Sequence, residues 1–124
     1  MDKFTGILLK PNRKPEVVYF DSMDVTLEQL YKLVECDTIQ IVRVPNTHYL
    51  MVIDDNGKFL RKHLNILATI LYQNTYDCIV GNALVLIDED AYSWDKYIEP
   101  DAYAIPPYLY EYMTATLEQL NKYV

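Results

Sequence analysis

The chain has 124 residues and a mass of 14.6 kDa, which is enough for one compact domain and too little for two ordinary ones. Its 11 lysine and arginine residues face 18 aspartate and glutamate residues, so the formal net charge is −7 and direct nucleic-acid binding is not expected. No apolar run is long enough to span a membrane, and the first residues lack the pattern of a secretory signal. We therefore expect a cytoplasmic protein without membrane contact.

The amino-terminal segment predicts a β-hairpin. Residues 4–10 and 16–20 contain branched apolar side chains, which favour strands. Between them, residues 11–15 include two prolines, and proline cannot donate to a strand ladder. We therefore expect two strands joined by this loop, followed by a turn at residues 21–24.

One short motif occurs twice and has the composition of a helix start. Thr26 lies three residues before Gln29, which is the spacing of a capping box, and the following apolar residues have helical spacing. We therefore predict a helix over about 26–35. Seven of nine positions in 26–34 are identical in 116–124. Shared capping chemistry explains this better than a duplication, because the flanking segments do not match.

The middle of the chain predicts further strands. Residues 39–44 form one that a proline ends, and residues 49–53 are apolar on both faces, which is typical of an interior strand. Asn56-Gly57 is a preferred pair in two-residue hairpin turns, because both positions tolerate positive φ. We therefore predict a hairpin here, with a return strand over 58–61.

A short helix and a last strand follow. Residues 65–72 have apolar side chains at helical spacing. Those expected to face inward are Ile66, Leu67, Ile70 and Leu71. Residues 83–87 are apolar throughout and predict a buried strand, and Gly81 before them indicates a bulge or a close backbone approach.

The last part of the chain differs in composition. The chain has 12 tyrosines against three phenylalanines and one tryptophan, and many of these tyrosines lie in the proline-containing segment 91–108. We expect a packed arm here, followed by a helix that starts near Tyr108 or at Thr116. A domain of this size can hardly bury such an arm alone, so we expect a homo-oligomer.

These elements predict one α+β domain. Its sheet is mainly antiparallel, and two or three helices pack on it. We assign residues 1–90 to the α+β core. Residues 91–124, the tyrosine-rich arm and the carboxyl-terminal helix, belong to the same compact domain.

The sequence gives no strong signature of catalysis or metal binding. A nucleophile needs a base within reach. The only histidines are His48 and His63, and a structural Cys78 fits better than a Cys78–His63 pair. Two cysteines without Cys-x-x-Cys spacing support neither a disulfide scaffold nor a zinc site. Residues 54–57 faintly resemble a calcium loop, but a turn fits better. We therefore expect a non-enzymatic protein without metal or cofactor.

The basic residues indicate an anion site. Arg61 and Lys62 belong to the one compact basic run, and Arg43 continues the apolar face of its strand. Each is a candidate for holding a phosphate at a pocket rim, although an ordinary surface role fits them as well. The aromatic candidates for stacking on a nucleobase are Trp94, Tyr103 and Tyr108.

The carboxylates indicate a second kind of surface. Asp88, Glu89 and Asp90 follow the last predicted strand, and Lys96 is the only cation from there to Glu111. Such a surface can imitate the charge of nucleic acid and occupy a basic groove on another protein. Ordinary surface charge is the alternative, and a solvated strand end fits residues 88–90 better than a divalent-ion site does.

Six segments follow one another in a characteristic order: Lys14–Val18, Thr26–Leu30, Ile39–Val42, Tyr49–Ile53, Asp55–Lys58 with Leu64-Asn65, and Tyr76–Val85. In this order they resemble a family of small domains of unknown function from bacteriophages, plasmids and their bacterial hosts, over about residues 4–90. The family lends no catalytic residues. The tyrosine-rich ending departs from the family's usual short one.

The resemblance implies a setting of mobile elements and conflict between phage and host. We therefore expect a non-enzymatic phage-type protein that counteracts bacterial defence by sequestering a nucleotide immune signal at a subunit interface. It would act in the host cytoplasm if it is phage-encoded. The alternative is an acidic interaction module, acting through residues 88–90, that inhibits a host nucleic-acid-binding defence enzyme. An unrecognised hydrolase is a third interpretation.

Overall fold

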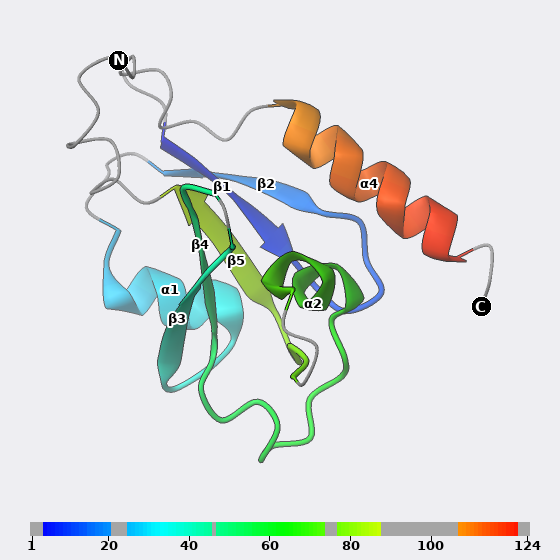
Figure 1. Ribbon diagram of the computed structural model, residues 1–124. Coiled ribbons are helices and arrows are strands. Elements are labelled where there is room, and N and C mark those ends of the chain that lie inside the picture. Colours follow the sequence, from blue (N-terminus) through cyan, green and yellow to red (C-terminus); the bar gives the residue numbers. More distant parts are fainter. Residues whose placement is uncertain (1–3, 21–24, 46, 74–76, 88–106, 122–124) are drawn as a thin grey trace.

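The computed structural model describes residues 4–20, 25–45, 47–73, 77–87 and 107–121 (Figure 1). Its strands are β1 (Phe4–Leu9), β2 (Glu16–Phe20), β3 (Ile39–Arg43), β4 (Tyr49–Asp54) and β5 (Ala83–Ile87). The helices among these residues are α1 (Leu27–Val34), α2 (Ile66–Tyr72) and α4 (Pro107–Asn121). The α+β fold with a single antiparallel sheet is confirmed.

The five strands form one sheet in the order β2-β1-β5-β4-β3. Two hairpins, β1–β2 and β3–β4, flank β5, and every neighbouring pair is antiparallel. Ala83 of β5 lies opposite both Leu9 and Ile53. At one end of the sheet, the end of β1, the start of β5 and the end of β4 therefore lie side by side.

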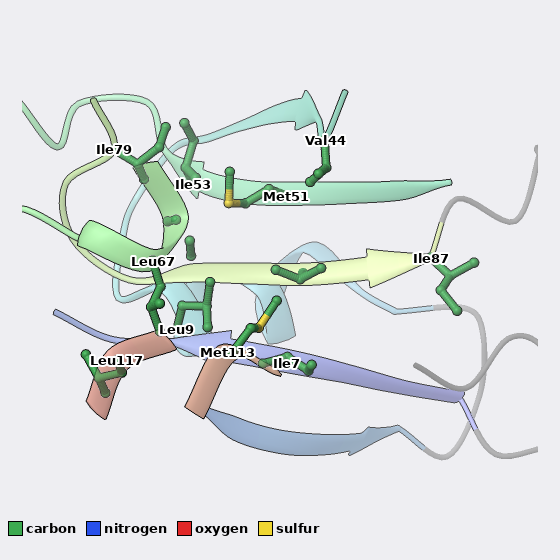
Figure 2. Close-up of a cluster of buried hydrophobic side chains, with 13 residues drawn as sticks. Ile7, Leu9, Val44, Met51, Ile53, Leu67, Ile79, Ile87, Met113 and Leu117 are labelled. Carbon is green, nitrogen blue, oxygen red and sulfur yellow. The ribbon is translucent and has the colours of Figure 1, made fainter. Parts of the chain in front are cut away.

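Both faces of the sheet are covered, which explains the continuous apolar runs of the interior strands. On one face, alternate side chains of β1, β4 and β5 pack against α2 and α4 (Figure 2). Met113 and Leu117 place α4 in this core. On the other face, Leu8, Val52 and Leu84 pack against α1. The sheet is therefore the middle of three layers, and its interior strands β1, β4 and β5 contribute side chains to both cores.

The capping box of α1 is confirmed, but the second copy of the motif is not a helix start. The Gln29 amide donates to Thr26 Oγ1 at 3.2 Å, and the Thr26 amide donates to Gln29 Oε1 at 2.9 Å. Thr116 lies inside α4, where its hydroxyl donates to the Tyr112 carbonyl oxygen at 2.8 Å. The helix begins at Pro107, which agrees with the predicted start near Tyr108, and proline is suited to the first helical position.

The predicted return strand over 58–61 is wrong. Neither Asn56 nor Gly57 has a positive φ, so the two-residue hairpin turn does not form. The Asn56 amide donates to Asp54 Oδ1 at 2.8 Å, and successive turns follow, with the Lys62 amide donating to the Gly57 carbonyl oxygen at 3.0 Å. Glycine is required for another reason: a Cβ on Gly57 would lie 2.9 Å from Val80 Cγ2.

Helix α2 is confirmed, but one of its four predicted inward residues is exposed. Leu67 and Ala68 are buried, Ile66 and Leu71 are half-buried, and Ile70 is exposed. A helix of only two turns presents a narrow face to the sheet. Ile70 lies outside that face.

A buried asparagine links α2 to the sheet. Asn65 is 1% exposed, and its Nδ2 donates to the carbonyl oxygens of Leu9 at 2.9 Å and Gly81 at 2.8 Å. Its Oδ1 accepts from the Ala68 amide at 3.2 Å and so caps the helix. One side chain therefore connects the end of β1, the residues before β5 and the start of α2.

We expect Asn65→Ala to lower the free energy of unfolding by about 3 kcal/mol, because it removes a cap and leaves two buried carbonyl oxygens without donors. Asn65→Asp keeps the capping acceptor but places a second carboxylate oxygen against the same two carbonyl oxygens, so it should lose at least as much, about 3 kcal/mol or more. Urea denaturation followed by circular dichroism measures both changes. The matched control is Asn56→Ala, an exposed residue, which should cost under about 1 kcal/mol. Equal losses at positions 65 and 56 would contradict the linking role of Asn65.

Candidate functional site

A cleft of about 710 Å³ lies at the end of the sheet where β1 ends and β5 begins. This volume is in the range of small-molecule sites. Its lining consists of Lys10, Pro11, Arg13, Val34, Glu35, Lys62, His63, Gly81 and Asn82. We call it the basic cleft.

The basic side chains of this cleft come from two segments that are far apart in the sequence. Lys10 and Arg13 belong to the β1–β2 loop, whereas Lys62 and His63 belong to the β4–α2 segment, residues 55–65. Lys10 Nζ lies 3.6 Å from Glu16 Oε1 in a solvent-exposed ion pair. Arg13 is exposed and forms no ion pair with any residue that the structure describes. Its guanidinium is available to a ligand.

Several residues in and beside the cleft have a left-handed backbone conformation, with positive φ. Of the five positive-φ residues in the described ranges, Glu35 and Gly81 line the cleft, and Asn12 and Arg61 adjoin lining residues. Positive φ costs a non-glycine residue about 1 kcal/mol or more, and such residues gather at functional sites. Gly81 has φ +76°, and a Cβ there would lie 2.9 Å from Lys62 Cδ. The left-handed φ therefore favours glycine here, and the missing Cβ also leaves room for the lysine stem.

Lys62 is held in place by a buried partner. Its Nζ lies 2.5 Å from Asp54 Oδ2, and the Asp54 side chain is 1% exposed. The same Nζ donates to the Glu35 carbonyl oxygen at 2.6 Å, at the left-handed cap of α1. Asn82 Nδ2 donates to Glu35 Oε2 at 2.8 Å. The charge of Lys62 is therefore compensated within the protein, and the cap of α1 is fixed to the cleft wall.

A smaller cavity of about 120 Å³ lies beside β4 and includes Asp54, Asp77 and Cys78 in its lining. Lys58 forms an ion pair with Asp77 there. Both cysteines are free thiols. Burial, and then the charge of Asp54, raises the pKa of the Cys36 thiol, which disfavours the reactive thiolate. Within the described ranges, no group of three or more histidine, cysteine or acidic side chains is placed to hold a metal ion.

The structure separates the predicted anion-site residues. Lys62 lines the basic cleft, and Arg61 is its exposed neighbour. Arg43 lies opposite Leu50, which pairs with Leu86, so it lies at the opposite end of the sheet. Arg43 therefore does not belong to the same cleft as Lys62, because the antiparallel register carries its strand end away from the cleft, and its role as an anion ligand stays a prediction.

Several other predicted residues lie outside the described part of the chain. These are Asp88, Glu89, Asp90, Trp94 and Tyr103; for Tyr108, only its place in α4 is described. Lys10, Arg13 and Asn82 were not predicted as site residues. The signals that the sequence offered for them are two basic residues shortly after the first strand and the Gly81-Asn82 pair directly before the last one. Only the β1–β5 pairing makes them neighbours.

We expect Lys62→Met to lower the free energy of unfolding by about 2 kcal/mol, because it leaves the buried Asp54 carboxylate without its cation. The double variant Asp54→Asn/Lys62→Met should recover more than half of this loss, because the uncompensated charge is gone. Thermal and urea unfolding measure the cycle. Lys58→Met is the control from the same segment, since its partner is partly exposed, and it should cost under about 1 kcal/mol. Strict additivity would rule out coupling between Asp54 and Lys62.

The model of a family described as a domain of unknown function, DUF3846, matches residues 4–100. The match covers most of the chain and all five strands, so the chain belongs to this family. No curated protein and no solved structure matches significantly. Among the described residues, no helix is long and apolar enough to cross a membrane.

Proposed function

We propose that this member of the DUF3846 family binds a small phosphate-bearing ligand in the basic cleft, with Arg13 and Lys10 as the main contacts. The observation that carries the proposal is that basic side chains from two segments line one cleft in a chain of net charge −7. Arginine can hold a phosphate through two parallel N–H···O bonds, and lysine adds a flexible point charge. Asp54 compensates Lys62 in a buried pair, whereas Lys10 has only the longer, partly exposed pair with Glu16, which is weak enough to give way to a ligand. Arg13 and Lys10 would therefore meet most of the ligand's charge.

The composition of the lining supports recognition of phosphate ahead of a nucleobase. Pro11 and Val34 supply the apolar surface, and no aromatic side chain belongs to the described lining. Stacking of a base by Trp94, Tyr103 or Tyr108 is a separate part of the proposal.

The finer proposal is that the ligand is a nucleotide signal of bacterial defence. The chain would sequester it without changing it chemically. The phage or plasmid setting, the host cytoplasm and the homo-oligomer belong to this same proposal. The family resemblance supports the setting and the defence signal by analogy, and the tyrosine-rich segment 91–108 supports the homo-oligomer.

We expect pyrophosphate, and at least one member of a panel of linear and cyclic nucleotides, to raise the melting temperature of the full chain. The shift should shrink with added salt, because exposed charges are screened. Lys10→Gln/Arg13→Gln should weaken binding about tenfold or more, as the loss of charged hydrogen bonds predicts. Titration calorimetry measures the affinities.

The control is Arg43→Gln, which removes a positive charge at the opposite end of the sheet. Its affinity should stay within about twofold of the wild-type value. Equal weakening in both variants, or no shift with any ligand, would overturn the assignment to the cleft. Chromatography of the recovered ligand tests the non-enzymatic part, because accumulating product would indicate turnover.

A further inference from the structure

The β4–α2 segment displays two neighbouring apolar side chains to solvent. Phe59 is 86% exposed, the largest value among the described large hydrophobic residues, and Leu60 is 57% exposed. Figure 1 shows this green segment extending beyond the end of the sheet. We call Phe59 and Leu60 the apolar tip. Neither residue lines the basic cleft, so the tip is independent of the proposed ligand site.

The turn that carries the tip is held by hydrogen bonds on both sides. The Leu60 amide donates to the Asn56 carbonyl oxygen at 2.9 Å, and the Arg61 amide donates to that of Lys58 at 3.1 Å. Asn56 Nδ2 donates to Thr38 Oγ1 at 2.9 Å, which ties the turn to the start of β3.

A contact between Gly57 of the turn and Val80, before β5, also holds the turn in place. Gly57 packs so closely on Val80 that a Cβ would lie 2.9 Å from Val80 Cγ2. Such a turn loses little conformational entropy when a partner binds it, and preorganised aromatic anchors are common hot spots of interfaces. Single exposed hydrophobic residues are ordinary on protein surfaces. Two adjacent ones in a turn that hydrogen bonds hold in place form a surface that a partner can cover.

The charges beside the tip indicate the chemistry of that occupant. Lys58 is paired with Asp77, and Lys62 is paired with Asp54. Arg61, the residue after Leu60, is exposed and forms no ion pair within the described part of the chain, and the exposed carboxylate of the segment, Asp55, lies beside Lys58 in the lining of the smaller cavity. One uncompensated cation beside an apolar anchor suits one carboxylate at the rim of an apolar pocket. Anionic membranes are recognised by clusters of several free cations, and the net charge of −7 opposes such binding.

We propose that the apolar tip docks into a partner protein. Phe59 and Leu60 fill an apolar pocket, and Arg61 pairs with a carboxylate at its rim. The partner is therefore recognised by a combination of apolar and acidic residues.

A displayed random-peptide library, selected on the immobilised full chain, tests this surface. The Phe59→Ala variant serves for counter-selection. We expect the enriched peptides to combine aromatic or aliphatic residues with aspartate or glutamate. Synthetic copies should bind Phe59→Ala and Arg61→Glu about tenfold more weakly than the wild-type chain. Tyr19→Ala, an exposed aromatic residue on β2, is the matched control and should bind normally.

Because Phe59 and Arg61 are exposed, their variants should keep the wild-type circular dichroism spectrum and melting temperature. Four outcomes would overturn the proposal. Peptides that bind Phe59→Ala as tightly as wild type, or no enrichment at all, would leave the tip without this role. Self-association lost in Phe59→Ala during sedimentation would assign the tip to a second copy of the chain. Sedimentation with phosphatidylglycerol vesicles, lost in the same variant, would assign it to a membrane.

Discussion

The amide of Asn65 is the constraint on which this end of the molecule depends. Its two donors satisfy the carbonyl oxygens of Leu9 and Gly81, and its acceptor caps α2. Lys10 follows Leu9 in the chain, and Asn82 follows Gly81, so the same side chain sets the separation of two cleft walls. A buried polar group without partners would destabilise the fold. Complete satisfaction of this amide therefore fixes both the packing of α2 and the shape of the cleft.

Most of the fold could be predicted because the local signals agreed with the tertiary contacts. The interior strands are apolar on both faces and are covered on both faces, and the capping box at Thr26 forms as its spacing predicts. The predicted hairpin return strand failed where a local signal met a stronger tertiary one, because the Asn56-Gly57 pair bonds to Asp54 and packs on Val80. Of the two predicted starts of the last helix, the one near Tyr108 is close to the observed start at Pro107, and Thr116 lies inside the helix.

The candidate site was less predictable, because it depends on which strands are neighbours. The compact basic run around Lys62 was visible in the sequence, but Lys10 and Arg13 lie in a proline-containing loop with no distinctive motif. They meet Lys62 only because β5 enters between the two hairpins and pairs with both β1 and β4. That topology has no local signature. The register also explains why Arg43, on an equally plausible strand face, lies at the far end.

Two lysines of the β4–α2 segment form ion pairs within the protein, and its arginine is exposed to solvent. Lys58 and Lys62 are held by Asp77 and Asp54, so an ion pair fixes the segment on either side of the apolar tip. Arg61, between the apolar tip and Lys62, is exposed. Loss of the cation from a buried carboxylate such as Asp54 costs more than loss of an exposed pair does, so the Asp54–Lys62 pair holds the backbone that carries the apolar tip. The same ion pair thus shapes the wall of the basic cleft on one side and the presentation of Phe59 on the other.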